Sequence, residues 1–144
     1  MIKIMFVCHG NICRSPMAEF VFRDMIKKAG VQDRFFVASS ATSTEEIGNS
    51  VYPPAKAELK KHGINCDGKR SVQLRFDDYD KYDLFIGMDN ANIRNMTRIF
   101  GKDPQNKIRK LNAADVADPW YYGNFDVTYA DVEKGCRTLL ESFI

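Results

Sequence analysis

A cysteine and an arginine six positions apart, Cys8 and Arg14, come directly after an apolar run at the amino terminus. A short loop wrapped around an anion points successive backbone N–H groups inward. A helix that follows adds the positive end of its dipole, and an arginine matches two phosphate oxygens. The same field favours the thiolate of Cys8, the nucleophilic form of cysteine. The pattern therefore predicts a phosphate-binding loop composed of His9, Gly10, Asn11, Ile12, Cys13, Arg14 and Ser15.

The elements that must position this loop alternate between strand-like and helical patterns. Apolar runs predict strands at residues 3–7, 35–38, 83–88 and 107–111, and helical spacing predicts helices at 15–28, 53–62, 90–100 and 125–143. A polar loop is expected at 39–50 and a helical turn at 77–82. Ser15 and Asp89 are the predicted N-caps of the first and third helices.

Strands separated by helices imply right-handed crossovers and a mainly parallel sheet. We expect an α/β fold, a three-layer, Rossmann-like four-stranded parallel sheet with helices on both faces, formed as one domain by residues 1–144. In such sheets, ligands bind beyond the carboxyl ends of the strands. Cys8 follows the first predicted strand and Asp118 follows the last one, so both should lie at the same edge of the sheet.

The composition is that of a globular domain, with 44% hydrophobic and 28% charged residues. The net charge of +2 is too small to indicate binding to nucleic acid or to an anionic membrane surface. No apolar run reaches membrane-spanning length, and the first one, which stops at Val7, is short for a signal peptide. We therefore expect a cytoplasmic protein that binds neither nucleic acid nor a membrane.

The sequence resembles the low-molecular-weight protein tyrosine phosphatases. Residues 8–16, CHGNICRSP, are similar to the phosphate loop of that family, and residues 118–121, DPWY, are similar to its general-acid loop. The likeness also covers residues 40–49, 62–64 and 85–96, so it extends over nearly the whole chain. A cysteine and an arginine with this spacing recur in unrelated phosphatase folds, whereas the long loop combined with DPW is specific.

By this resemblance, Cys8 attacks phosphorus and forms a cysteinyl-phosphate intermediate, while Arg14 and the loop amides bind the equatorial oxygens. Asp118 protonates the departing phenolate and later activates a water molecule. Ser15 donates a hydrogen bond to the Cys8 sulfur, and Asn11 holds the loop in its anion-binding conformation. Neither a metal ion nor a cofactor is expected.

The resemblance also implies a substrate. His9 and Ile12 should line the entrance together with the rim residues Glu45, Glu46, Trp120 and Tyr121. A deep slot with aromatic walls suits a phosphotyrosine protein or peptide, or a small aryl phosphate, and two carboxylates at the rim should disfavour acidic peptides. Relatives that act on phosphoarginine carry threonine where this chain has Ile12. We expect a monomer or a weak homodimer.

The four cysteines, Cys8, Cys13, Cys66 and Cys136, could form two disulfides by count alone, but a reducing compartment would keep them as thiols. We expect Cys66 and Cys136 to be ordinary thiols. Cys13 either packs behind the loop or, as the resemblance favours, acts as a redox partner that forms a reversible disulfide with Cys8 under oxidation.

One segment departs from the family. Many relatives carry a histidine in an H-x-A-R-Q segment that supports the loop asparagine, whereas residues 68–73 read GKRSVQ. Ser39 or Ser71 is the predicted replacement for that hydrogen bond. His62 is expected to interact with carbonyl groups at a helix end.

Several other functions compete with the phosphotyrosine phosphatase. A thiol-dependent arsenate reductase shares the fold, but it would have to relay a disulfide through Cys66 or Cys136. A phosphoarginine phosphatase and a noncatalytic phosphate-binding module are further alternatives. A zinc-binding module could be built from Cys8, Cys13, His62 and Cys66, although it would explain neither the arginine nor the DPW segment.

Overall fold

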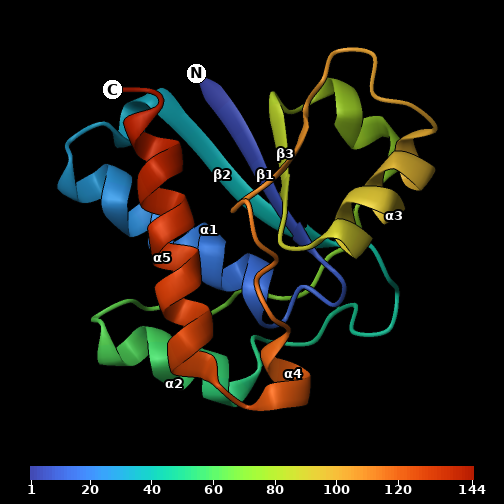
Figure 1. Cartoon of the computed structure of the whole chain (residues 1–144). Coiled ribbons are helices and arrows are strands. Elements are labelled where there is room, and N and C mark those ends of the chain that lie inside the picture. Colours follow the sequence, from blue (N-terminus) through green and yellow to red (C-terminus); the bar gives the residue numbers. More distant parts are fainter.

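The computed structural model describes residues 1–144 and is built on a four-stranded parallel sheet (Figure 1). Its strands lie in the order β2-β1-β3-β4 and comprise β1 (Ile2–Cys8), β2 (Phe35–Ala41), β3 (Leu84–Gly87) and β4 (Ile108–Lys110). The chain leaves β1 for β2 on one side and returns to β3 on the other. The carboxyl ends of β1 and β3 therefore form the switch point at which open α/β sheets bind ligands.

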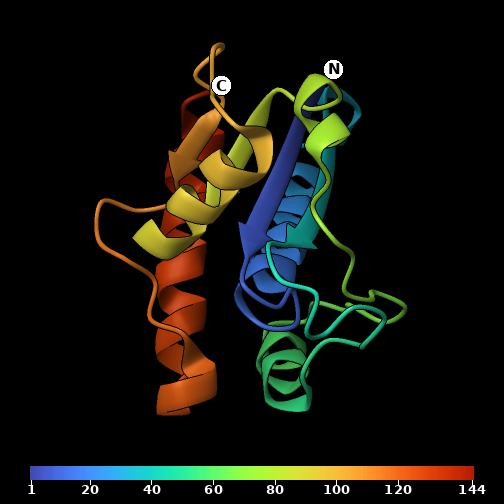
Figure 2. The same cartoon turned by 90° about the vertical axis from the view of Figure 1, so that its right-hand side faces the viewer.

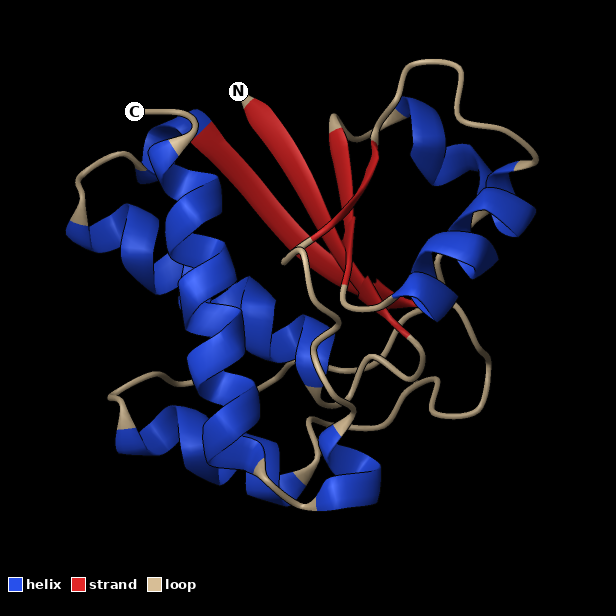
Figure 3. Ribbon diagram, viewed as in Figure 1, coloured by secondary structure: helices blue, strands red, loops and turns tan.

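Helices cover both faces of the sheet, which confirms the predicted fold class (Figures 2 and 3). On one face lie α1 (Arg14–Lys28) and α5 (Phe125–Glu141), and α2 (Pro53–Lys61) packs against both of them. The other face is covered by α3 (Asn90–Phe100) and the 3-10 helix η2 (Phe76–Asp80). The remaining short helices are η1 (Gln32–Arg34) and α4 (Pro119–Tyr122), and α4 was not predicted from the sequence.

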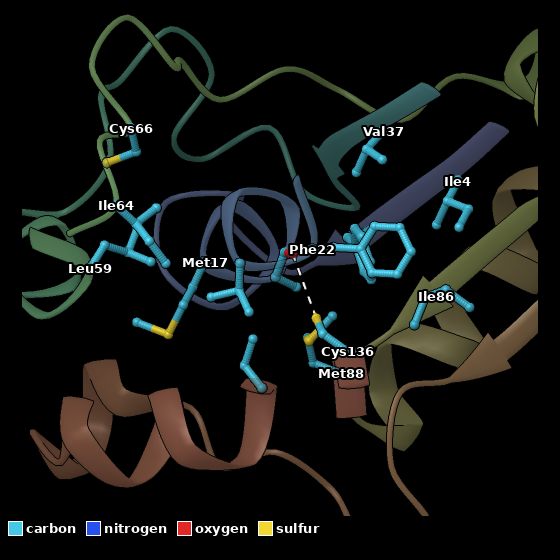
Figure 4. Packing of buried hydrophobic residues seen from close by; sticks show 14 of the residues in the cluster. Ile4, Met17, Phe22, Val37, Leu59, Ile64, Cys66, Ile86, Met88 and Cys136 are labelled. Carbon is cyan, nitrogen blue, oxygen red and sulfur yellow. Dashed lines mark hydrogen bonds between the residues drawn. The ribbon is translucent and has the colours of Figure 1, made fainter. Parts of the chain in front are cut away.

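The alternation of side chains along β1 explains why this strand is central. Ile4 and Phe6 belong to the apolar cluster under α1 and α5, whereas Met5 and Val7 belong to the cluster under α3. Figure 4 shows the first cluster, in which the thiol of Cys136 donates a hydrogen bond of 3.6 Å to the Ala18 carbonyl. Because β1 is buried on both faces, the residue at which it ends has a fixed position.

Two local predictions were wrong, and both errors concern polar residues near the loop. Strand β2 continues through Ser39 and Ser40 to Ala41, where a polar loop was expected, because its backbone pairs with β1 and because Glu19 and Lys69 bond the hydroxyl and the carbonyl of Ser39. Helix α1 begins at Arg14, so Ser15 lies within its first turn and is not its N-cap. The cap at Asp89 is confirmed, since its carboxylate accepts a hydrogen bond of 2.8 Å from the backbone N–H of Asn92.

The segment between β4 and α4, residues 111–118, returns across the carboxyl edge of the sheet. Its backbone N–H groups at Leu111 and Val116 donate to the carbonyls of Gly87 and Met88, each at 2.9 Å. The segment passes so close to α5 that a Cβ atom on Gly135 would lie 2.4 Å from Leu111 Cγ. Backbone bonds and this close approach together fix the path that leads to Asp118.

No helix in the structure combines the length and the apolar character that crossing a bilayer requires.

Candidate active site

The loop between β1 and α1 surrounds the sulfur of Cys8 with hydrogen-bond donors. The backbone N–H groups of Asn11 and Ser15 point at Sγ from 3.3 and 3.4 Å, and the Ser15 hydroxyl lies 3.0 Å away. Helix α1, which is 15 residues long, directs its amino-terminal end at the same place. Three donors and a helix terminus converge on one sulfur, and this arrangement stabilises a negative charge there.

The backbone and the side chain of Asn11 stabilise the conformation of the loop. Its backbone is left-handed, with φ of 57°, a conformation that asparagine adopts more readily than most residues. Its Nδ2 atom donates to the hydroxyls of Ser15 and Ser39 at 2.7 and 2.9 Å, and its Oδ1 atom accepts from the backbone of Val72 at 3.1 Å. All these contacts require the same orientation of the amide, so the side chain is fixed.

The two serines proposed to replace the absent histidine have different partners. Ser39 bonds the Asn11 side chain, whereas Ser71 donates at 2.8 Å to the carbonyl of Gly10. Both serines therefore support the loop, but only Ser39 contacts the asparagine.

The guanidinium of Arg14 is buried and held by the segments that follow β3 and β4. Nη1 donates to Asp89 Oδ2 at 2.7 Å and to the Val116 carbonyl at 2.9 Å, while Nη2 lies 3.6 Å from Asp118 Oδ2. Burial alone would lower the pKa of Arg14, but the Cys8 thiolate and the two aspartates outweigh it and raise this pKa above its ordinary value. The side chain therefore remains a cation in the site.

Asp89 was predicted only as a helix cap, and its contact with Arg14 was not foreseen. One oxygen caps α3 and the other binds the guanidinium, so a single carboxylate joins two functions. The sequence did contain one indication of this second role. Asp89 comes directly after a strand that neighbours β1, and the carboxyl ends of these strands form the ligand-binding edge of the sheet.

Cys8, Arg14 and Asp118 line one cavity of about 390 Å³. Every predicted rim residue lines it as well, whereas the loop residues Asn11 and Ser15 are buried and do not. The lining residues are Cys8, His9, Gly10, Ile12, Cys13, Arg14, Glu45, Glu46, Asp118, Trp120 and Tyr121. Asp118 also caps α4, since its Oδ1 atom accepts from the Trp120 backbone at 3.0 Å. Its other oxygen is thereby left to face Arg14.

The rim carries both aromatic and acidic side chains. Trp120 packs against Tyr52, with their ring centroids 4.7 Å apart, and Tyr52 is a supporting residue that the sequence did not reveal. The ring of His9 contacts the carboxylate of Glu45 at 2.8 Å, and Glu46 accepts from the Asn49 side chain at 2.6 Å. The lining of the cavity therefore includes an indole and two carboxylates.

The residues of the zinc hypothesis do not converge. The ring of His62 stacks on Tyr129, with ring centroids 3.7 Å apart, and bonds the Glu58 carboxylate at 3.1 Å. Its backbone N–H donates at 3.0 Å to the carbonyl of Leu59 at the end of α2, so the expected interaction with helix-end carbonyls is made, through the backbone. Cys66 and Cys136 are buried free thiols away from the cavity. No three histidine, cysteine or acidic side chains gather where they could hold a metal ion.

This fold and site define a class of phosphatase, and comparisons with known proteins agree. The family model described as low molecular weight phosphotyrosine protein phosphatase matches residues 3–143. The chain is 37% identical to the low molecular weight protein-tyrosine-phosphatase YfkJ of Bacillus subtilis, over 99% of this chain and 96% of that protein. It is 38% identical to the low molecular weight phosphotyrosine protein phosphatase of Gallus gallus, over 96% of this chain and 94% of that one.

Solved structures give the same result. The crystal structure of SP-PTP, the low molecular weight protein tyrosine phosphatase of Streptococcus pyogenes, superimposes with a TM-score of 0.94 at 39% identity, over 100% of this chain and 94% of that chain. The crystal structure of YfkJ superimposes with a TM-score of 0.95 at 37% identity, over 99% and 94% of the two chains. The chain belongs to the low molecular weight protein-tyrosine phosphatase family.

The double contact of Asp89 generates a prediction. Substitution Asp89→Ser keeps a good N-cap for α3 but removes the carboxylate that holds Arg14. We expect the inhibition constant of inorganic phosphate to rise at least about tenfold, since a hydrogen bond between charged groups contributes about 1.5–3 kcal/mol. The control is Asp115→Ser, in which a largely exposed carboxylate is removed from the same edge of the sheet. Equal phosphate inhibition of wild type and Asp89→Ser would refute the role given to Asp89.

Proposed function

We propose that this enzyme hydrolyses phosphotyrosine through a cysteinyl-phosphate intermediate, with Cys8 as the nucleophile and Asp118 as the general acid. The observation that carries the proposal is the position of the buried Arg14 guanidinium. It lies in the same cavity as the donor-surrounded Cys8 sulfur, with Asp118 Oδ2 at 3.6 Å from Nη2. Nucleophile, phosphate ligand and acid thus surround one space.

In the first step, the thiolate of Cys8 attacks phosphorus opposite the phenolic oxygen. The S–P bond forms, the P–O bond breaks, and the proton of Asp118 moves to the departing oxygen. Arg14 and the loop N–H groups bind the equatorial oxygens, over which the transition-state charge is spread. These donors are held in place before the substrate arrives, so they need little reorganisation during the reaction.

In the second step, the Asp118 carboxylate takes a proton from water, the water oxygen attacks phosphorus, and the S–P bond breaks. The sulfur leaves as a thiolate, and the hydroxyl of Ser15 at 3.0 Å can donate a hydrogen bond to it. This bond lowers the energy of the leaving group. The donors that favour attack in the first step therefore also favour departure in the second.

Three features support phosphotyrosine over the alternatives. The Trp120 wall, backed by Tyr52, suits an aromatic ring, and the apolar Ile12 lines the cavity where phosphoarginine-specific relatives carry threonine. A disulfide relay for arsenate reduction is disfavoured because neither Cys66 nor Cys136 lines this cavity.

The free thiols also bear on where the protein acts. All four cysteines are free, which fits a reducing compartment such as the cytoplasm.

The general-acid role predicts a dependence on the leaving group. Substitution Asp118→Asn should slow phosphotyrosine cleavage by about 10²–10⁴-fold, because the phenolate then leaves without a proton. The burst of dinitrophenolate from 2,4-dinitrophenyl phosphate should fall much less, since this group leaves without protonation. Pre-steady-state phenol release measures both rates.

Cys8→Ser, which should have no measurable turnover, controls for contaminating phosphatases in this experiment, and Asp126→Asn controls for the loss of an exposed carboxylate. Equal losses on the two substrates would show that Asp118 is not the proton donor. Retention of activity in Cys8→Ser would refute the proposed function itself.

The two glutamates of the rim predict a preference for the charge of the residues that flank phosphotyrosine in a peptide. Phosphotyrosine peptides with basic flanks should have a higher kcat/KM than matched acidic ones, because Glu45 and Glu46 face the entrance. Exposed ion pairs contribute about 0.2–1 kcal/mol, so each charge should change kcat/KM up to about fivefold. The double substitution of both glutamates by glutamine should reduce the preference, as should added salt. A preference of the wild type for acidic peptides would contradict this assignment.

We further propose that Cys13 protects Cys8 during oxidation. Peroxide converts the Cys8 thiolate into a sulfenic acid, and the sulfur of Cys13 then forms the disulfide and displaces hydroxide. Burial raises the pKa of Cys13, and the negative charges of Cys8 and Asp118 raise it further. A neutral sulfenic acid at Cys8 removes one of these charges, so oxidation itself makes Cys13 easier to ionise.

This proposal predicts different recovery after oxidation. Wild-type activity lost to peroxide should return when dithiothreitol is added, whereas Cys13→Ser should recover several-fold less because its sulfenic acid oxidises further. Cys66→Ser, which removes a buried thiol outside the cavity, is the matched control. Equal recovery by wild type and Cys13→Ser would exclude the protective disulfide.

A further inference from the structure

A largely buried lysine lies against the end of β2 and the first half of α1, although the proposed reaction makes no use of it. The side chain of Lys69 is only 12% exposed, and its Nζ atom donates at 2.8 Å to the carbonyl of Ser39. The same atom lies 3.6 Å from Oε1 of Glu19, whose side chain is 4% exposed. A buried charge is costly unless it is paired. The ammonium of Lys69 and the carboxylate of Glu19 each supply the opposite charge that the other needs.

Glu19 is the far end of a continuous series of hydrogen bonds that leads to the catalytic sulfur. Its Oε1 atom accepts from the hydroxyl of Ser39 at 2.6 Å. Because Ser39 has one hydrogen and gives it to Glu19, its oxygen is free to accept from Asn11, which it does at 2.9 Å. Asn11 donates its second amide hydrogen to Ser15, at 2.7 Å.

The direction of this series has a consequence at Cys8. Since the oxygen of Ser15 accepts from Asn11, the single hydrogen of its hydroxyl is left to point at the sulfur, 3.0 Å away. The bonds therefore diverge from the Asn11 amide, whose NH2 group donates to Ser15 on the side of Cys8 and to Ser39 on the side of Glu19. Because a carboxylate can only accept, Glu19 takes the Ser39 hydrogen and leaves the Ser39 oxygen facing this NH2 group, which supports the amide orientation that directs the Ser15 hydrogen at the sulfur.

We propose that Lys69 is a positioning residue, whose ammonium offsets the charge of the buried Glu19 carboxylate and so holds in place the acceptor that orients Ser39, the Asn11 amide and, through this amide, the Ser15 hydroxyl at Cys8. It acts through Glu19, Ser39, Asn11 and Ser15 and does not touch the substrate. The inference rests on Cys8 as the nucleophile of the proposed function. Burial lowers the pKa of Lys69, while its interactions with Glu19 and Cys8 oppose that effect, as a close ammonium–carboxylate pair requires.

A second positively charged side chain, that of Arg23, also pairs with the Glu19 carboxylate, so its loss can be compared with the loss of Lys69. Arg23 contacts the other carboxylate oxygen, Oε2, at 2.6 Å and is 49% exposed. The hydrogen bond to Ser39 is made by Oε1, the oxygen beside Lys69. Loss of Lys69 should therefore disturb the series more than loss of Arg23, although each substitution removes one positive charge from the same carboxylate.

The test is the pH dependence of Cys8 alkylation by iodoacetamide, which needs no phosphatase turnover. In Lys69→Met, the midpoint pH of inactivation should rise by about one unit, and kcat should fall roughly tenfold, because the thiolate loses a directed donor. Lys69→Arg should stay close to wild type. Lys69→Gln keeps a donor for the Ser39 carbonyl but no charge, so it should behave like Lys69→Met. Arg23→Met should shift the midpoint by less than half as much.

Thermal unfolding of each variant shows whether it is folded, and Lys69→Gln keeps the test valid if Lys69→Met is not. A wild-type midpoint in Lys69→Gln would mean that Lys69 only satisfies the carbonyl, and the proposal would fall. Equal shifts in Arg23→Met and Lys69→Met would also overturn it. Because alkylation reports on the sulfur alone, absence of phosphotyrosine hydrolysis by wild type would refute the proposed function without deciding this inference.

Discussion

The proposed mechanism depends on a thiolate at Cys8 and a guanidinium at Arg14 that are both shielded from water and both stabilised as charged groups by their neighbours. Cys8 and Arg14 are both buried, and neither could stay ionised in an apolar surrounding. The backbone donors at the start of α1 serve the sulfur, and Asp89 serves the arginine. The incoming phosphate then completes a set of charges that is already oriented. Preorganisation of this kind explains how a small domain can stabilise the charge of phosphoryl transfer.

The sheet provides this orientation because its switch point brings distant segments together. Cys8 ends β1, Asp89 follows β3, and the segment after β4 returns to place Val116 and Asp118 on the two nitrogens of the Arg14 guanidinium. Arg14, the proposed phosphate ligand, is thus also the anchor of the segment that carries the proposed acid, Asp118. In the proposed mechanism, a change in the position of Arg14 would move this acid as well, which would couple phosphate binding to proton transfer.

The layer beneath the loop has a second function besides mechanical support. Ser39 and Asn11 belong to different segments, yet together they connect Glu19 to Ser15 and Cys8 through hydrogen bonds that diverge from the Asn11 amide. The histidine that many relatives carry in this region is absent, and here Lys69 lies against the same layer. Ordinary packing residues could fill this space, but they could not orient a hydroxyl hydrogen. The buried charges at Glu19 and Lys69 are therefore consistent with a role in reactivity as well as in stability.

Much of this was accessible from local sequence. Apolar periodicity predicted the alternation of strands and helices, the loop residues from Cys8 to Ser15 carried the phosphate chemistry, and the Asp89 cap followed from its place before a helix. These features depend on neighbours within a few positions, so pattern and spacing are sufficient to find them. The cavity's lining residues were also foreseen, because the resemblance extended along nearly the whole chain.

Contacts between distant segments were decided only by the tertiary structure. The extension of β2 through Ser39, the second contact of Asp89, the support of Trp120 by Tyr52 and the burial of Lys69 all join residues far apart in the chain. A serine in a strand or a lysine in a loop looks ordinary until its partner is known, since hydrogen bonds and burial belong to pairs of residues. The sequence alone therefore determined which groups are proposed to carry the chemistry, and the fold determined their partners, their orientations and their supports.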